Sequence, residues 1–458
     1  MTSPGEQVDT QDPVTRAFPT AAGTLVGRVD GDVIRMIGVP YATAERFGAP
    51  VRVDVPLGAD GDPAPFEAFV RGPASPQIAS PILQELLPGA AEGMYGSEHC
   101  QTLTITAPAD VEPSERLPVM VWIHGGSYVT GAGDIPLYDS AALAVEQRVV
   151  VVSVTYRLGV LGFYGDGLTV PANLGLLDVI AALEWVGLAI EGLGGDPALV
   201  TLFGQSAGGD VISHLMISDR ARGLFRRAIV QSDPLGLMRG RGPMVDAMLT
   251  ATGTPRRDAP IDDLLALQPV AEKAARRFGL KGGMPFGVQY GHAPLPPEPE
   301  TDAAWREVAP TIDVLIGTMR EETRMYVAVV PALRAILALP VLGWVFRRVV
   351  LRPTTDLIYT NDAKRFAARH RAAGGRATRY EIRWAPPGSR IGAGHVGDLP
   401  LLLGTEASWT RTALVGDGDW PDVQVRGVAL RKAWAEFART GSVGATTLPA
   451  DEVAFFRD

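Results

Sequence analysis

The sequence predicts a mostly parallel, doubly wound α/β sheet with helices on both faces. Six runs rich in Val and Ile are continuous rather than alternating, as expected for strands that are covered on both faces. Helical patterns lie between these runs, and strands that alternate with helices favour a parallel sheet. The 52 Gly and 37 Pro among 458 residues suit a fold with many turns and stay below the level typical of disorder.

The expected elements follow one another along most of the chain. Residues 22–55 alternate in short runs with turns, which fits antiparallel strands at one edge of the sheet. The later strands are expected at residues 119–124, 149–156, 200–203, 227–231, 313–317 and 379–384. The helices are expected at residues 173–190, 207–217, 262–279, 321–337, 361–373 and 423–440.

The domain organisation is expected to be simple. We expect residues 1–18 to form a flexible N-terminal tail and residues 19–458 to form one catalytic domain. The start of the chain lacks a basic stretch followed by an apolar run, so no secretory signal is visible. The single cysteine, Cys100, excludes an intrachain disulfide and any metal site built from several cysteines. These features favour the reducing cytoplasm.

Charge and hydropathy exclude two classes of partner. The net charge of −9 and the scattered arginines make nucleic acid an improbable partner. Residues 327–346 are long and apolar enough to cross a bilayer, but Pro331, Arg334 and Pro340 interrupt them. We interpret this segment as a buried or pocket-covering helical region, with contact to a membrane surface as the less favoured alternative. No stable membrane insertion is expected.

One serine lies in a motif that suits a catalytic nucleophile. The segment Gly204-Gln205-Ser206-Ala207-Gly208 falls between an expected strand and an expected helix. A nucleophile on a sharp strand-to-helix turn needs neighbours without side chains, because the strand and the helix pack closely there. The turn also places the hydroxyl at a helix N-terminus, where the dipole favours developing negative charge. We therefore predict Ser206 as the nucleophile rather than as a simple helix cap.

His395 is the expected general base. In hydrolases with this motif the acid and then the base follow the serine along the chain. His395 lies in the loop GAGHVGDLP after the strand 379–384, where a turn can bring an imidazole over the sheet edge. His99 and His124 precede the serine, and His214 shares its helix. His292 precedes any plausible acid, and His370 lies in a helix that is expected to be exposed.

The acid is expected after the strand 313–317, where Glu321 and Glu322 stand side by side. Its role is to hold the imidazole in the correct tautomer and to stabilise the imidazolium. We favour Glu322 and keep Glu321 as the alternative. One of the two is expected only to complement a helix dipole.

Backbone amides are needed to bind the oxyanion. Ala207 supplies one because it directly follows the nucleophile. The glycine-rich loop His124-Gly125-Gly126-Ser127-Tyr128 supplies the others, since glycine lets the backbone approach the substrate closely.

Several motifs, in order, resemble a known family. They are GVPYATAERFGAP, GSEHCQTLTI, VMVWIHGGSY, VTYRLGVLGF, NLGLLDVIAALEWV, GGDPALVTLFGQSAGG, MPFGVQYGHAPLP, LIGTMREET and GAGHVGDLP. Together they resemble the type-B carboxylesterases, the cholinesterase-like group, and among these the bacterial para-nitrobenzyl esterases. The resemblance implies an α/β-hydrolase fold with helical insertions over the active site.

Carried over position by position, the family's site residues fall on this chain as follows. The triad is Ser206, Glu322 and His395, the oxyanion amides are those of Gly126, Ser127 and Ala207, and the serine that supports the acid is Ser232.

Four positions depart from the family pattern. Ser127 replaces the third glycine of the oxyanion loop, and its side chain is expected to narrow the acyl side of the pocket. Thr323 follows the acid and Val396 follows the base, where the family has glycine. Cys100 matches a cysteine that many relatives bridge, but the partner region here holds Ser75, so no bridge is expected.

The implied reaction is acyl transfer through an acyl-enzyme, with a small-molecule ester as the partner and neither metal nor cofactor. Four aromatic residues are expected to line an apolar pocket that favours uncharged esters with short to medium acyl groups. They are Tyr128, Phe163, Trp344 and Phe346. The alternatives are cleavage of an amide, carbamate or thioester, and a non-catalytic cholinesterase-like binding protein. We expect a monomer or a weak homo-oligomer.

Overall fold

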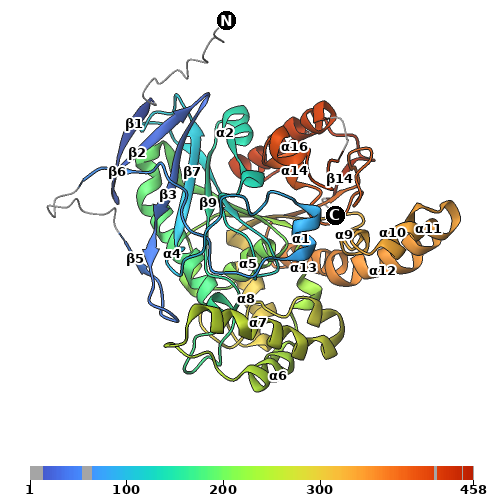
Figure 1. The fold of residues 1–458 in the computed structure, drawn as a ribbon. Coiled ribbons are helices and arrows are strands. Elements are labelled where there is room, and N and C mark those ends of the chain that lie inside the picture. The colour runs from blue at the N-terminus through green and yellow to red at the C-terminus, as the bar shows by residue number, and fades with distance from the viewer. Residues whose placement is uncertain (1–13, 54–63, 417–419, 446, 457–458) are drawn as a thin grey trace, which may run out of the picture.

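A twelve-stranded sheet crosses the molecule in the computed structural model, which describes residues 14–53, 64–416, 420–445 and 447–456 (Figure 1). The strand order is β1-β2-β3-β7-β9-β8-β10-β11-β12-β13-β14, with β6 beside β2. The strands are β1 (Thr15–Thr20), β2 (Gly23–Asp30), β3 (Val33–Pro40), β6 (Phe66–Glu67), β7 (Thr102–Pro108), β8 (Leu117–Ile123), β9 (Val150–Val154), β10 (Gly195–Gln205), β11 (Arg227–Gln231), β12 (Asp313–Met319), β13 (Ala377–Ile382) and β14 (Val453–Phe456). Strands β4 (Ala42–Thr43) and β5 (Val51–Arg52) form a separate small sheet.

The centre of the sheet is parallel and its edges are antiparallel. Strands β9, β8, β10, β11, β12 and β13 pair in parallel, whereas β1, β2, β3 and β7 pair antiparallel on one side and β14 does so on the other. The predicted parallel α/β sheet and its antiparallel edge are therefore confirmed, and all six predicted central strands are present. Strands β7 and β14 were not anticipated.

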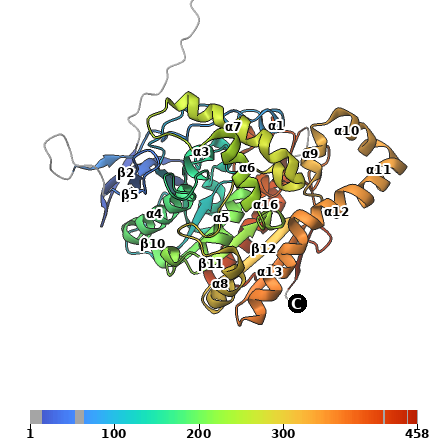
Figure 2. The same cartoon turned by 90° about the horizontal axis from the view of Figure 1, so that it is seen from below.

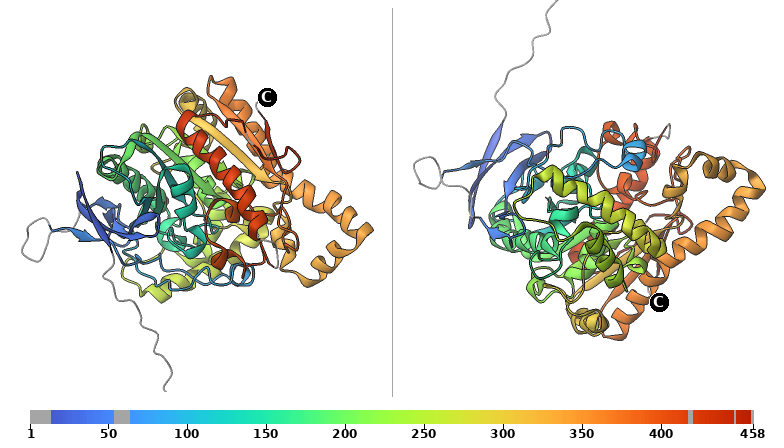
Figure 3. Two further views of the ribbon diagram at one scale, coloured as in Figure 1. Left: turned by 90° about the horizontal axis from the view of Figure 1, so that it is seen from above. Right: turned by 60° about the horizontal axis from the view of Figure 1, so that its bottom comes forward.

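Helices cover both faces of the sheet (Figures 2 and 3). They are α1 (Pro81–Leu86), α2 (Ala141–Gln147), α3 (Gly159–Gly162), α4 (Leu174–Ala189), α5 (Ala207–Leu215), α6 (Gly242–Thr252), α7 (Ile261–Ala275), α8 (Thr301–Val308), α9 (Arg324–Ala328), α10 (Pro331–Ala338), α11 (Pro340–Phe346), α12 (Arg352–Thr355), α13 (Asn361–Ala372), α14 (Leu399–Leu402), α15 (Glu406–Trp409) and α16 (Trp420–Thr440).

The alternation of side chains along β8 divides the core into two clusters. Val119 and Val121 pack with residues of α4, α5 and α13, whereas Met120 and Trp122 pack with residues of α2 and α16. Because successive strand residues point to opposite faces, a continuous apolar strand needs helices on both sides. This arrangement fixes the carboxyl ends of the central strands as one edge at which loops can meet.

Two expectations about the organisation are wrong in part. Residues 15–18 of the expected tail belong to strand β1, which pairs with β2, and residues 1–13 lie outside the described residues. Residues 327–346 are mostly helical, as expected, but only Ala328, Leu337 and Gly343 among them are buried. This segment forms much of an arm of helices α10 and α11 that projects from the body (Figure 1). Among the described residues, no helix combines the length and apolarity needed to cross a bilayer.

Gly187, an exposed residue within helix α4, generates a stability prediction. A Cβ added at Gly187 meets nothing within 4 Å, so Gly187→Ala should raise the free energy of unfolding by about 0.5–1 kcal/mol. Chemical denaturation measures this gain. The contrasting variant is Gly208→Ala, whose Cβ would lie 2.0 Å from the carbonyl oxygen of Ile123 and should destabilise the fold strongly. Equal effects of the two substitutions would contradict the packing described here.

Candidate active site

Ser206 occupies a strained turn between β10 and α5. Its φ of 59° and ψ of −126° lie where residues with a side chain are rarely found. The turn is held by close packing, since a Cβ at Gly204 or Gly208 would lie 2.6 or 2.0 Å from the carbonyl oxygen of Ile123. The amide of Ser206 also donates to Gln231 O at 2.9 Å. The glycines thus have the steric role that the motif predicts.

Glu322 and His395 form a buried hydrogen-bonded pair. The Nδ1 atom of His395 lies 2.6 Å from Oε2 of Glu322, and the backbone amide of His395 donates to Glu322 O at 3.1 Å. The other carboxylate oxygen accepts from the amide of Met319 at 2.7 Å. Glu322 is fully buried, and these contacts give both of its carboxylate oxygens a hydrogen-bond partner. The pair fixes the tautomer of His395 with its proton on Nδ1 and leaves Nε2 as an acceptor.

Glu321 points elsewhere, although it adjoins Glu322. Its carboxylate forms ion pairs with Arg324 at 2.6 Å and with Arg347 at 3.4 Å. The geometry therefore brings Glu322, and not Glu321, to the histidine.

The remaining nitrogen of His395 lies beside Gln205, a residue that the sequence analysis did not select. The amide nitrogen of Gln205 is 3.2 Å from Nε2 of His395, while the hydroxyl of Ser206 has no hydrogen-bond partner among the described residues. Ser206, Gln205 and His395 all line one cavity. The place of Gln205 directly before the nucleophile, on a strand end, is the signal that could have identified it.

Three amides near Ser206 make no internal hydrogen bond in the described part of the chain: those of Gly126, Ser127 and Ala207. Gly126 has a φ of 117°, and a Cβ there would lie 1.9 Å from Thr130 O, so only glycine fits. Ser127 follows with a φ of 55° and lines the cavity, whereas Ala207 opens helix α5. Free N–H groups at a helix N-terminus and on an adjoining loop are suited to bind a negatively charged oxygen.

Ser232, which was expected to support the acid, does not contact Glu322 by a hydrogen bond among the described residues. It is buried after β11 with a φ of 51°, and its amide donates to Gly317 O at 2.8 Å. Among the described residues, the oxygens of Glu322 accept from His395 and Met319 and not from the Ser232 hydroxyl.

The cavity at Ser206 has a volume of about 330 Å³ and is largely apolar. Its apolar side chains come from the region of α1, the loop after β8, η1 (Pro136–Tyr138), α9, α14 and α15. They include Leu83, Leu87, Val129, Leu137, Met325, Leu399 and Trp409. The side chains of Glu272 and Arg276 stand at the same cavity and supply its charged groups.

The predicted pocket aromatics are wrong. Tyr128 and Phe163 are buried against each other with ring centroids 4.5 Å apart, because the Tyr128 hydroxyl donates to Asp210 beneath the oxyanion loop. Trp344 is 60% exposed on the projecting arm, and Phe346 lies on the same helix. None of the four lines the cavity at Ser206.

The other buried histidines have structural partners. His370 is 1% exposed and its Nε2 contacts Ile312 O at 2.8 Å, so the expectation of a solvated face is wrong. Nε2 of His214 lies 2.7 Å from the hydroxyl of Tyr290. His124 stacks on Tyr156, and burial lowers its pKa to about 4.

The two departures beside the triad positions have different consequences. The hydroxyl of Thr323 lies 2.9 Å from Thr354 Oγ1 and 3.2 Å from Leu351 O, so it ties the acid loop to the base of the arm. Val396 has a φ of 66°, which is strained for a β-branched residue. Cys100 is free and buried, as expected.

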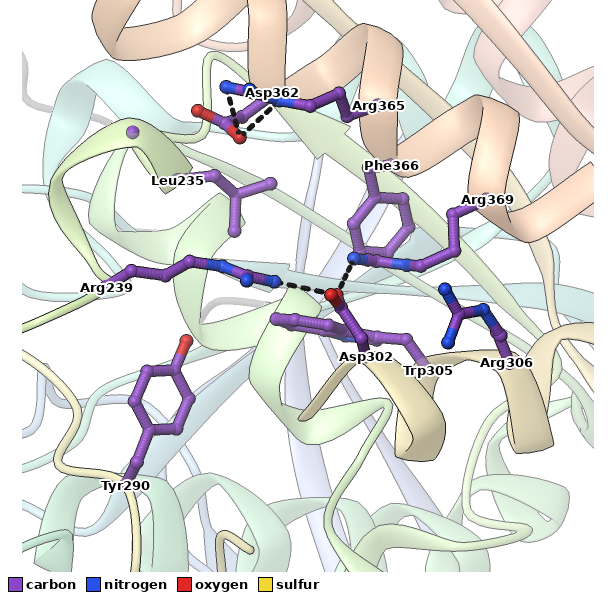
Figure 4. Close-up of a pocket in the computed structure, with 11 residues that line it drawn as sticks. Leu235, Arg239, Tyr290, Asp302, Trp305, Arg306, Asp362, Arg365, Phe366 and Arg369 are labelled. Carbon is purple, nitrogen blue, oxygen red and sulfur yellow. Dashed lines mark hydrogen bonds and ion pairs between the residues drawn. The ribbon is translucent and has the colours of Figure 1, made fainter. Parts of the chain in front are cut away.

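Several cavities lie outside this centre, and two of them matter for the function. One of about 660 Å³ adjoins it across the oxyanion loop and shares Leu83, Gly126 and Thr130 with it. The other, of about 430 Å³, lies between α8 and α13 and shares no lining residue with the Ser206 cavity (Figure 4). Asp302 pairs with both Arg239 and Arg369, and Asp362 pairs with Arg365, so the four arginines that line this cavity outnumber its two carboxylates. Within the described residues, no three His, Cys, Asp or Glu side chains are grouped so that they could hold a metal ion.

The sheet order and the strained serine turn define an α/β-hydrolase. The sequence profile of the Carboxylesterase family matches residues 15–336, and the chain belongs to this family. It is a serine carboxylesterase that hydrolyses carboxylic esters.

Relatives and solved structures cover almost the whole chain. The "Probable N-octanoylanthranilate hydrolase AqdA2" of Rhodococcus erythropolis is 37% identical over 93% of this chain and 93% of its own. The para-nitrobenzyl esterase of Bacillus subtilis (strain 168) is 31% identical over 92% and 89%. A solved "thermophylic PNB esterase" is 28% identical with a TM-score of 0.75 and covers 95% of this chain and 93% of that one.

The buried carboxyl of Asp398, three residues after His395, generates a pH prediction. Burial raises its pKa to about 6, and only one of its oxygens has a hydrogen-bond partner, the Gln231 amide at 2.6 Å. A carboxyl whose pKa is raised on folding binds more protons in the folded state, so its ionisation costs stability as the pH rises through the window from about 4 to 6. Asp398→Asn should therefore stabilise the protein above pH ~6 by up to about 3 kcal/mol and change little below pH ~4.

Thermal unfolding of Asp398→Asn at both pH values measures this difference. Asp246→Asn, which removes an exposed carboxylate from α6, controls for the loss of one charge. A stabilisation that is equal at both pH values would contradict the burial argument.

Proposed function

We propose that Ser206, His395 and Glu322 form the catalytic triad of this carboxylesterase, with Gly126, Ser127 and Ala207 as the oxyanion hole. The observation that carries the proposal is the Glu322–His395 pair at 2.6 Å, whose histidine lines the same cavity as Ser206. The single catalytic domain, residues 19–458, contributes all of these groups.

The reaction proceeds by acyl transfer. Nε2 of His395 accepts the hydroxyl proton while Ser206 Oγ attacks the ester carbonyl, and the three amides bind the oxyanion. The imidazolium then gives its proton to the leaving alcohol, which leaves an acyl group on Ser206. Water, deprotonated by the same nitrogen, attacks this acyl-enzyme, and the acid leaves with Ser206 restored.

Gln205 stands where the histidine nitrogen must receive this proton. With Nδ1–H donated to Glu322, Nε2 accepts from the Gln205 amide at 3.2 Å. The same amide nitrogen lies 3.5 Å from Nδ1, so Gln205 sits beside both ring nitrogens and close to the atom that the Ser206 hydroxyl must reach. Catalytic hydrogen bonds commonly tighten only when substrate is bound.

The substrate is proposed to be an uncharged ester with a short to medium acyl group. The 330 Å³ cavity lies near the lower end of the range of roughly 300–1,000 Å³ for small-molecule sites. Its apolar lining suits an alkyl or aryl group. The adjoining 660 Å³ cavity gives room for the other half of the ester.

A second candidate is the amide of a medium-chain acid. The name of the 37% identical relative denotes release of an octanoyl group from a nitrogen atom. The same triad can carry out this cleavage if His395 protonates the leaving amine. The relative rates on octanoyl esters and octanoyl anilides separate the two candidates.

We also propose that the enzyme acts in the cytoplasm, as a monomer or weak homo-oligomer. The absence of any cysteine besides the free, buried Cys100 supports the location.

Labelling by a fluorophosphonate probe tests the nucleophile. The wild-type protein should label and Ser206→Ala should not, because the probe reacts only with an activated serine. A wild-type protein that fails to label would contradict the triad and would favour the non-catalytic reading.

The adjacent glutamates provide a matched test of the acid. Glu322→Gln should lower kcat by about 10³–10⁴-fold, since the imidazole then loses its fixed tautomer and its counter-charge. Glu321→Gln should retain activity within roughly tenfold, because its partners are Arg324 and Arg347. Steady-state kinetics on p-nitrophenyl butyrate compare the two, and the opposite ranking would overturn the assignment.

A series of p-nitrophenyl esters from acetate to laurate tests the substrate class. The value of kcat/KM should rise to a maximum at a short or medium chain and then fall, because the cavity at Ser206 is small. A steady rise to laurate is the result that excludes this proposal.

A further inference from the structure

The projecting arm carries an unusual concentration of exposed apolar side chains. We define the helical arm as residues 330–351, which contain α10, α11 and the following helical turn η8 (Arg347–Leu351). Of the 21 large apolar side chains exposed in the described residues, eight lie in the arm: Val330, Leu339, Val341, Leu342, Trp344, Val345, Val349 and Val350. Such a grouping on an otherwise polar surface marks a contact site.

The arm is a defined structure. Helix α11 packs closely on α10, since a Cβ at Gly343 would lie 2.5 Å from Leu337 O. From Pro340 the backbone continues in helical conformation through η8, α12, η9 (Asp356–Thr360) and α13 to Ala372, so the arm is joined rigidly to the body. The arm is therefore held out from the body, as Figures 1 and 3 show, and its exposed apolar side chains are held out with it.

The charge on this segment has one sign. Between Glu322 and Asp356 the chain has five arginines and no acidic residue, although its net charge is −9. Arg324, Arg347 and Arg352, near the base, have carboxylate partners. Arg334 and Arg348 are exposed, and neither has a carboxylate partner among the described residues.

These features match an anionic lipid surface. Helices that lie in a membrane interface combine an apolar face carrying Trp, Leu or Phe with basic residues at its margin. Here Trp344 is 60% exposed, and the Arg348 guanidinium lies over its ring at 5.9 Å. A second copy of the chain fits less well, because a two-fold contact through the arm would bring the unpaired arginines together.

We propose that the helical arm docks peripherally on anionic phospholipid bilayers, with its apolar tip among the acyl chains and Arg334 and Arg348 at the headgroups. The body is acidic and would be repelled by such a surface. The twelve helical residues from Pro340 to Leu351 extend about 18 Å, which exceeds the screening length of about 8 Å at physiological ionic strength. The arm can thus touch the bilayer while the body remains screened from it.

Docking would also place the active site near the lipid. The residues that precede the arm, Met325 and Tyr326 of α9, line the Ser206 cavity. This inference rests on the proposed esterase function: docking brings the cavity close to the membrane and therefore favours lipophilic esters that partition into it.

Vesicle co-sedimentation of the full chain tests the docking. Ser206→Ala should be used as the parent, so that binding is measured without hydrolysis and separately from the proposed catalysis. The parent should sediment with vesicles that contain phosphatidylglycerol, much less with phosphatidylcholine alone, and less as the salt concentration rises. Failure to bind anionic vesicles at low salt would overturn the proposal.

Paired variants locate the binding on the arm. Arg334→Gln with Arg348→Gln should weaken partitioning by about tenfold or more, since each arginine near the surface contributes about fivefold. Val341→Ser with Leu342→Ser should also weaken it, by removing apolar side chains that are 73% and 55% exposed. Arg220→Gln with Arg222→Gln changes the net charge equally at exposed sites outside the arm and should have little effect.

Fluorescence gives an independent readout. Brominated lipids should quench part of the tryptophan emission of the parent, and this quenching should be lost in Trp344→Phe.

Two results would contradict the proposal. One is equal vesicle binding by the arm variants and the control; the other is a concentration-dependent dimer that the Val341→Ser, Leu342→Ser variant abolishes, which would make a second copy the occupant.

Discussion

The left-handed backbone at Ser206 is the constraint on which the rest of the site depends. This conformation is unfavourable for a serine, and it persists because β10 and α5 are held against Ile123 at a distance that only glycines permit. The same contact places the N-terminus of α5 beside the loop of Gly126 and Ser127. The position of the hydroxyl at the cavity and the three unpartnered amides are therefore consequences of one packing interaction in the described part of the chain.

The proposed acid and base depend on a different interaction, because Glu322 lies in the short turn between β12 and α9 and His395 lies in the longer loop after β13. They are joined by two hydrogen bonds, one through the side chains and one from the His395 amide to Glu322 O. Thr323 then ties this pair to the base of the arm, and Tyr326 and Tyr359 pack near the imidazole. These contacts thus connect the proposed base, His395, to the helical arm, which lies outside the hydrophobic core.

The features that could be predicted from the sequence are those fixed by local sterics and by chain order. Gly204 and Gly208 leave few conformations for the turn, and continuous Val and Ile runs demand cover on both faces. The direction of a side chain such as Tyr128 was not predictable, because it follows from a hydrogen bond to Asp210 on another element. His370 and Trp344 were misplaced for the same reason: helical periodicity does not reveal which face meets the body.

The arm shows why apolar content alone could not decide between a buried and an exposed segment. A buried helix and a surface-seeking helix can have the same composition, and the difference lies in which charges accompany them. In a buried helix, each of the five arginines would need a hydrogen-bonded or charged partner. Here Arg324, Arg347 and Arg352 are paired with carboxylates, whereas Arg334 and Arg348 are exposed to solvent without one among the described residues. Because the rest of the chain is strongly acidic, the segregation of positive charge to one projecting element disfavours contact between two arms and favours contact with negative surfaces.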